Sequence, residues 1–222
     1  MSKHNALNML GRSGNPTLSD ATFSDFEKID QKTMTLQGTV NKVGILLALV
    51  VLSAAYTWNV YFVTGSPGAL MPIGLFGGMI FALITIFKKN WAMYTAPIYA
   101  ILEGFFLGGI SAIFESQYPG IVIQATGLTF GTLASLLVLY KTGIIKPTEN
   151  FRLMVVSATM GIALLYVVSF IMSMFGTGIG FIHDNGIFGI GFSLFVVAIA
   201  ALNLVLDFDF IEEGAEKNAP KY

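Results

Sequence analysis

Six long apolar segments, evenly spaced, constrain this chain more than any other feature of its sequence. They cover about residues 43–63, 70–87, 94–115, 121–140, 152–175 and 187–208. Each is close to the roughly 20 residues that an α-helix needs to cross about 30 Å of hydrocarbon. A backbone in lipid must satisfy its own hydrogen bonds, and these segments lack the alternating polarity of barrel strands. The sequence therefore predicts an all-α, polytopic transmembrane helix bundle with six spans.

Basic residues predict how the bundle is oriented. All 12 Lys and Arg residues lie in the two tails or in the second and fourth loops with their margins, and the other loops have none. They are Lys3, Arg12, Lys28, Lys32, Lys42, Lys88, Lys89, Lys141, Lys146, Arg152, Lys217 and Lys221. Because cytoplasmic loops carry the excess of Lys and Arg, we expect the N- and C-termini to be cytoplasmic.

The two tails differ from the bundle between them, residues 43–211. Residues 1–42 are polar and hold no apolar run that could serve as a cleaved signal peptide. Within them, Ser24-Asp25-Phe26-Glu27 fits a capping box that opens a short helix. Residues 212–222 form an acidic tail, which we also expect to be cytoplasmic.

Composition excludes several classes of partner and chemistry. Hydrophobic residues make up 55% of the chain and charged residues 11%, against roughly 25% charged in soluble proteins. The lipid bilayer is therefore one expected partner. A net charge of -1 gives no reason to expect a nucleic acid. With no cysteine, the chain has no disulfide, thiolate metal site or Cys nucleophile.

The remaining polar motifs favour neither an enzyme nor a cofactor. The glycine-rich stretches 176–180 and 186–191 lack the context of a nucleotide loop, so we expect no nucleotide. His183 and Asp184 could join a metal site, but no further ligands are evident, and a solvated turn explains them better. His4 and His183 lie outside the spans, where neither could serve an intramembrane serine nucleophile. An aspartyl site needs two carboxylates on separate elements, which one helix does not supply.

Small residues four apart let helices approach closely in lipid. Gly104 with Gly108, and Gly127 with Gly131, have this spacing. We expect both pairs to mark close helix packing.

Two glutamates of the third span are candidate pore or ion-contact residues. Glu103 lies nine residues after Tyr94, which at about 1.5 Å per residue is about 14 Å along the helix, near the middle of the bilayer. It either lines a cavity or permeation path, or is a protonated acid bonded to a neighbouring helix. Glu115 marks the outer end of the same span, where an interfacial anchor is the stronger explanation.

Asp207 and Asp209 interrupt the end of the last apolar segment, and they are the candidate pH sensor or gate. Two residues rotate a helix by about 200°, so the two carboxylates cannot both face one partner. Asp207 either exchanges its proton near neutral pH or belongs to a solvated helix end that leads into Glu212, Glu213 and Glu216. We expect Asp209 to face water.

Three stretches resemble one family of membrane proteins. They are residues 34–58 (MTLQGTVNKVGILLALVVLSAAYTW), 96–115 (APIYAILEGFFLGGISAIFE) and 202–214 (LNLVLDFDFIEEG). They are similar to the bacterial branch of the Bax inhibitor-1/YccA-like family, and the similarity covers nearly all of the chain after residue 30. The resemblance implies a bacterial inner-membrane protein, and characterised members are described as pH-sensitive calcium leak channels.

The same resemblance implies a sensor and a further helix. The family sensor is a pair of aspartates, one ending the sixth helix in a Tyr-Asp-Thr-Gln-x-Ile type segment and one in a seventh helix. Asp207 matches the first aspartate and Ile211 the isoleucine, whereas Asp209 replaces the glutamine. This sequence stops at Tyr222 without a seventh apolar segment. The expectation is a truncated chain or a member that lacks that helix.

Two functional classes follow. As a channel, the protein would pass calcium or other cations, with Glu103 attracting them and Asp207 opening or closing the inner end. Calcium prefers six to eight oxygen ligands, so its contacts would be transient and its passage hydrated and slow. As a non-transporting regulator, the protein would present its tails to a protein partner; the resemblance implies this class because other family members are described as modulators of stress or cell death or of a membrane-bound quality-control protease.

Overall fold

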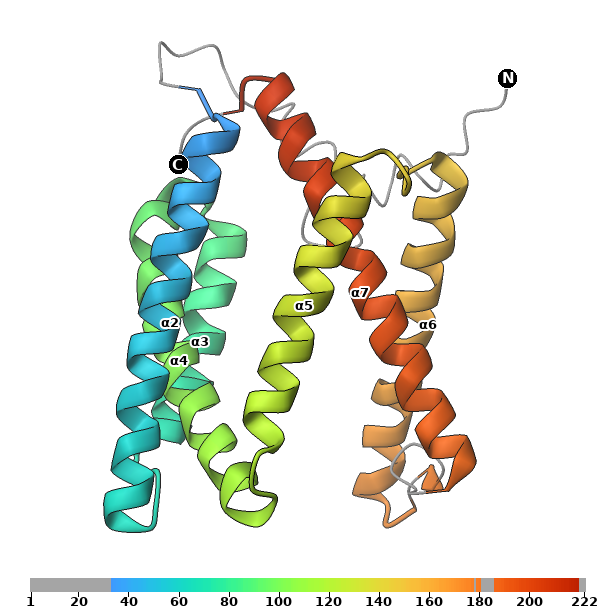
Figure 1. The fold of residues 1–222 in the computed structure, drawn as a ribbon. Coiled ribbons are helices and arrows are strands. Elements are labelled where there is room, and N and C mark those ends of the chain that lie inside the picture. Colours follow the sequence, from blue (N-terminus) through green and yellow to red (C-terminus); the bar gives the residue numbers. More distant parts are fainter. Residues whose placement is uncertain (1–32, 178, 181–185, 220–222) are drawn as a thin grey trace. The chain divides into compact units, whose positions relative to one another are not determined.

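The computed structural model describes residues 33–177, 179–180 and 186–219, and it is helical (Figure 1). Its elements are α2 (Leu36–Thr64), α3 (Leu70–Phe87), the 3-10 turn η2 (Lys89–Trp91), α4 (Ala92–Gln117), α5 (Ile121–Lys141), α6 (Glu149–Met174) and α7 (Ile187–Glu216). Six helices are long and apolar enough to cross a membrane. This confirms the all-α class and the six spans. The orientation of the termini stays a prediction.

Some sequence features lie outside the described residues. These are the capping box at residues 24–27, His4, and the His183–Asp184 pair.

Two helices extend well beyond their apolar segments, by seven or more residues at one end. α2 begins at Leu36, because the Thr35 hydroxyl accepts a hydrogen bond from the Gly38 N–H at 3.1 Å and caps the helix. α7 continues to Glu216, past the expected end near residue 208. The first residues of the expected acidic tail are therefore helical. Hydropathy locates the apolar part of a helix, whereas hydrogen bonding decides where the helix ends.

The chain divides into two compact units, with the boundary inside α5 between Thr129 and Phe130. In the unit with α2, α3 and α4, the central helix α4 packs against both of the others. Within the same unit, the backbone N–H of Met34 donates to the Ala219 carbonyl at 2.6 Å.

Glycines set the distance between these three helices. A Cβ atom on Gly108 of α4 would lie 2.2 Å from the Ala54 carbonyl oxygen of α2, and one on Gly104 would lie 1.9 Å from the Ser53 hydroxyl. On α3, a Cβ on Gly74 would lie 2.5 Å from the Leu102 carbonyl oxygen. No side chain fits at such distances, so the expected packing through Gly104 and Gly108 is confirmed.

The other glycine pair behaves differently. Within the described residues, no heavy atom outside the local helix lies within 4 Å of a Cβ position on Gly127 or Gly131. The expectation of close packing at this pair is therefore wrong for the described structure. Spacing alone does not reveal whether a partner helix lies opposite.

In the other unit, α6 and α7 pack along an apolar seam. Val155, Val156 and Leu206 are buried together, and Phe151 and Leu202 pack against them. This seam positions the polar residues near the start of α6 and the end of α7.

We expect Gly108→Ala to lower the thermal unfolding midpoint in detergent. The new methyl group would meet backbone atoms of α2 that cannot rotate away, and overpacking of this kind costs about 1–3 kcal/mol. Gly131→Ala is the matched control: its methyl group enters open space, and alanine favours a helix over glycine by about 0.8–1.0 kcal/mol. Equal midpoints for the two variants would contradict the role of Gly108.

Candidate functional site

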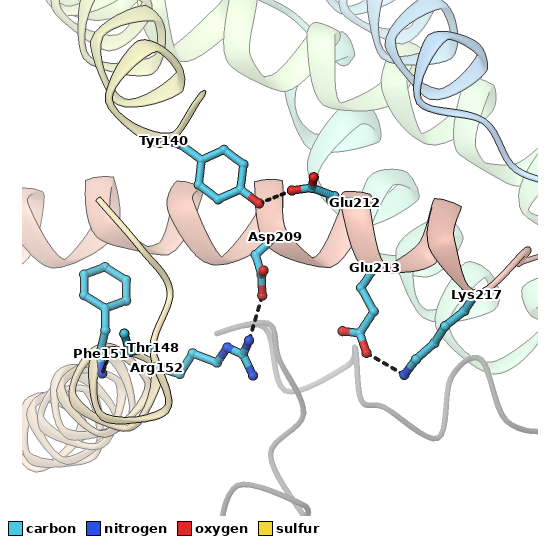
Figure 2. Close-up of polar contacts among 8 residues, drawn as sticks. All are labelled: Tyr140, Thr148, Phe151, Arg152, Asp209, Glu212, Glu213 and Lys217. Carbon is cyan, nitrogen blue, oxygen red and sulfur yellow. Dashed lines mark hydrogen bonds and ion pairs between the residues drawn. The ribbon is translucent and has the colours of Figure 1, made fainter. Parts of the chain in front are cut away.

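Asp209 forms a buried ion pair with Arg152 of α6 (Figure 2). Arg152 Nη2 donates to Asp209 Oδ2 at 3.0 Å, and the two side chains are only 15% and 9% exposed. The expectation that Asp209 faces water is therefore wrong. Because α7 continues through this point, Leu202, Leu206 and Asp209 fall on one helix face at spacings of four and three residues, the face that packs on α6.

This pair is energetically consequential. Ions lose much of their hydration when buried, and each partner then depends on the other for compensation. Removing one partner of a buried pair typically costs about 3–5 kcal/mol, because it leaves an uncompensated charge. Arg152 Nε is also buried and has no hydrogen-bond partner among the described residues. The guanidinium therefore has a donor left over after its contact with Asp209.

Asp207 lies on a different side of α7. It is half-buried, and the helix turns about 200° between residues 207 and 209. The helix is continuous here, as expected, so the two carboxylates leave it in different directions.

The glutamates that follow are part of the same arrangement. The Tyr140 hydroxyl of α5 donates to Glu212 Oε2 at 2.5 Å, and Tyr140 also packs on Phe208 with ring centroids 5.8 Å apart. Glu213 is buried and pairs with Lys217 one turn later at 2.5 Å. Figure 2 shows the hydrogen bond of Tyr140 with Glu212 and the ion pair of Glu213 with Lys217 along the C-terminal half of α7. This segment is held by specific contacts and is not simply a solvated helix end.

A neutral polar contact lies deeper on the α6–α7 seam. Asn203 Nδ2 donates to the Thr159 hydroxyl at 2.8 Å and to the Ile199 carbonyl at 2.9 Å. Amides inside a membrane helix are usually hydrogen-bonded to a neighbour, as this one is. The Asn203–Thr159 hydrogen bond therefore joins α7 to α6 without a charged group.

The contacts of Arg152, Tyr140 and Asn203 with neighbouring helices were not predicted from the sequence. The sequence pattern predicted for Arg152 only a place at the margin of a span, where it helps to orient the bundle. A signal was present, since a carboxylate in an apolar helix needs a countercharge and Arg152 begins the preceding span on the same expected side. Nothing in the local sequence identified which carboxylate it would meet.

Glu103 lies between α4 and α3. Its Oε2 atom is 3.5 Å from the position that a Cβ on Gly78 would take, so the carboxylate rests over this buried glycine. The Tyr99 phenol, one turn earlier on α4, interacts with the same carboxylate. The side chain is half-buried and has a polar neighbour within its own helix. Its role as an ion contact stays a prediction.

Glu115 caps the next helix. Its two carboxylate oxygens accept hydrogen bonds from the N–H groups of Gly120, at 2.6 Å, and Val122, at 3.1 Å. These donors lie at the start of α5, where backbone N–H groups lack helical partners and a negative charge is favourable. Gly120 permits the sharp turn between α4 and α5, because its φ of 89° lies in the left-handed region. This geometry favours the anchor explanation for Glu115.

We expect Glu115→Ala to accelerate amide hydrogen exchange at Gly120 and Val122, since loss of a helix cap typically costs about 0.5–2 kcal/mol. Glu115→Gln, which keeps one carbonyl acceptor, should give an intermediate effect. Exchange measured by mass spectrometry on the peptide around residues 118–124 tests this. Parental exchange in the alanine variant would contradict the capping role.

Among the described residues, no group of three His, Cys, Asp or Glu side chains could hold a metal ion. No curated protein and no solved structure matches the chain. A family model described as "Bax inhibitor 1 like" matches residues 15–222. Six helices among the described residues are long and apolar enough to span a membrane, so the chain is an integral, multi-pass membrane protein, and it belongs to the Bax inhibitor 1 like family.

Proposed function

We propose that this protein is a pH-sensitive leak channel for calcium or other cations, gated by a titrating carboxylate in the C-terminal half of α7. The observation that carries the proposal is the buried pair of Asp209 with Arg152. Ionisable groups within membrane helices are costly and are associated with ion paths and proton relays. Family membership supports the same class of membrane protein.

In the proposed gate, protonation changes how strongly α7 is attached to α6. While Asp209 is ionised, it attracts the guanidinium of Arg152 and joins α7 to α6. Protonation removes that attraction but leaves Arg152 charged, because arginine does not lose its proton in proteins. Acidification therefore loosens the C-terminal half of α7, and the leak increases as the pH falls. By the positive-inside rule, this end of α7 is cytoplasmic.

The permeating ion keeps most of its water. Calcium prefers six to eight oxygen ligands, and no described cluster of acidic residues could supply a binding site. Glu103 contributes a single carboxylate in the middle of α4, where it attracts cations without holding them. We therefore expect hydrated cations to pass slowly and with weak selectivity.

A regulator that binds a protein partner is the competing class. That hypothesis relied on the tails as the presented surface. Two of the three glutamates expected to lead into the acidic tail, Glu212 and Glu213, instead make contacts within the chain. These contacts support a gate in α7 better than an acidic tail that is presented to a protein partner.

We expect purified protein in liposomes loaded with a calcium dye to leak severalfold faster at about pH 4 than at about pH 7, because the adjacent guanidinium favours the ionised form of Asp209 until the solution is acidic. Asp209→Asn should leak rapidly at both pH values, because the neutral amide imitates the protonated acid. Asp207→Asn is the matched variant, two residues away on the same helix. A parental pH response in Asp207→Asn would remove Asp207 from the gate, and the same response in Asp209→Asn would remove Asp209.

The calcium leak of the unmodified protein distinguishes the two functional classes. Leak no greater than that of empty liposomes at every pH would contradict transport and favour the partner-binding class. In that case, deletion of residues 1–30 should abolish capture of the partner.

A further inference from the structure

We propose that the turn between α3 and α4 binds an anionic phospholipid. Lys88 and Lys89 contact the phosphate of its headgroup, and the exposed aromatic side chains beside them lie against its glycerol and acyl chains. The turn consists of the 3-10 helix η2 (Lys89–Trp91) and the residues on either side of it. By the positive-inside rule, it lies at the cytoplasmic face of the membrane. The lipid site is separate from the proposed gate and does not require transport.

The turn carries two positive charges that the surrounding chain does not neutralise. Lys88 and Lys89 are both exposed, and no ion pair of either lysine occurs among the described residues. The sequence has no Asp or Glu from residue 31 to residue 102. The next acid, Glu103, lies about 20 Å along α4 from the turn, at about 1.5 Å per residue. The charge of the turn therefore favours an anionic partner.

Exposed aromatic side chains flank the two lysines. Phe87, the last residue of α3, is 78% exposed, and Trp91 and Tyr94 on the other side are 59% and 67% exposed. Trp and Tyr favour the boundary between headgroups and hydrocarbon, and a Lys side chain can extend its ammonium group from there towards the headgroups. One phospholipid molecule offers a phosphate to the ammonium groups and acyl chains to the rings. A free phosphate would engage the lysines alone, so the aromatic residues favour the lipid.

Hydrogen bonds hold the turn in one conformation. The Thr85 hydroxyl of α3 donates to Thr95 Oγ1 of α4 at 2.7 Å, and the Thr95 hydroxyl donates to the Trp91 carbonyl at 3.1 Å. The backbone N–H of Trp91 donates to the Lys88 carbonyl at 2.8 Å, and that of Lys88 to the Ile84 carbonyl at 2.7 Å. The backbone that carries both lysines and Trp91 is thus ordered before a lipid arrives, which lowers the entropic cost of binding.

The loop between α5 and α6 also carries two exposed lysines, Lys141 and Lys146, but in a different setting. An acid, Glu149, follows Lys146 at the start of α6. The aromatic residues that flank this loop are engaged elsewhere, since Tyr140 donates to a glutamate of α7 and Phe151 packs on the apolar seam. This loop therefore provides a control with equal charge and without exposed aromatic neighbours.

The fluorescence of Trp91 can report which lipid lies beside the turn. The chain has two tryptophans, so Trp58→Phe leaves Trp91 as the only one. The full chain is placed in bilayers of phosphatidylcholine with a minor fraction of phosphatidylglycerol, and the acyl chains of one lipid or the other are brominated, because bromine quenches tryptophan on contact. We expect phosphatidylglycerol to be enriched severalfold beside Trp91 over its fraction in the bilayer, and less so at high salt. With Trp91→Phe, the remaining Trp58 of α2 should report no enrichment.

We expect Lys88→Gln with Lys89→Gln to abolish the enrichment, because each lysine near an anionic headgroup contributes about fivefold in affinity. Lys88→Arg with Lys89→Arg keeps both charges and should retain it. Lys141→Gln with Lys146→Gln should also retain it. Both lysines of the turn are exposed, so the glutamine variant should unfold at the parental midpoint in pure phosphatidylcholine, which separates lost binding from misfolding.

The absence of enrichment in the parent would overturn the proposal. So would parental enrichment in the variant with Lys88→Gln and Lys89→Gln, or an equal loss in the control loop variant. Soluble glycerol phosphate distinguishes a lipid from a free phosphate ester as the ligand. If millimolar glycerol phosphate removes the enrichment at constant ionic strength, the lysines bind a free phosphate group and the lipid assignment is wrong; unchanged enrichment supports the lipid.

Discussion

The arrangement of the C-terminal half of α7 depends on one constraint, namely that a charge in an apolar helix must be compensated. Asp209 meets this constraint through Arg152, and the pair is almost removed from solvent. Around it, Glu212 is bonded to Tyr140 and Glu213 to Lys217. Asp209, Glu212 and Glu213, three acidic side chains within five residues, are thus tolerated because each has a specific partner. The proposed gate uses this arrangement, because neutralising Asp209 would remove its attraction to Arg152.

The two units hold their helices together by different means. Between α2, α3 and α4, glycines allow backbone contact, so attraction comes from close packing that pH does not alter. Between α6 and α7, a short apolar cluster is flanked by an ion pair and an amide–hydroxyl bond. The first unit is suited to a fixed scaffold. The second contains the groups whose interaction changes with protonation, and it is there that we place the gate.

Carboxylates of similar chemistry have different environments in this protein. Glu115 accepts two backbone N–H groups and caps a helix, Glu103 rests over a glycine beside Tyr99, and Asp209 faces an arginine. The sequence identified all three as residues of interest, because acids near apolar segments are rare. Their partners distinguish the helix cap at Glu115 from the proposed switch at Asp209. Two of those partners, Gly120 and Tyr99, are close in sequence, whereas Arg152 is 57 residues from Asp209.

The sequence alone determined the all-helical class and the six spans, and it identified Asp207 and Asp209 as candidate functional residues. These follow from local properties, namely the length and hydropathy of each segment and the cost of charge in lipid. Only the tertiary structure decided that α7 continues to Glu216, that Asp209 is buried, and that Arg152, Tyr140 and Asn203 contact neighbouring helices. The physical reason is that a side chain's partner depends on how two helices are rotated and aligned against each other. That rotation is set by packing along the whole seam and is not encoded in any single stretch.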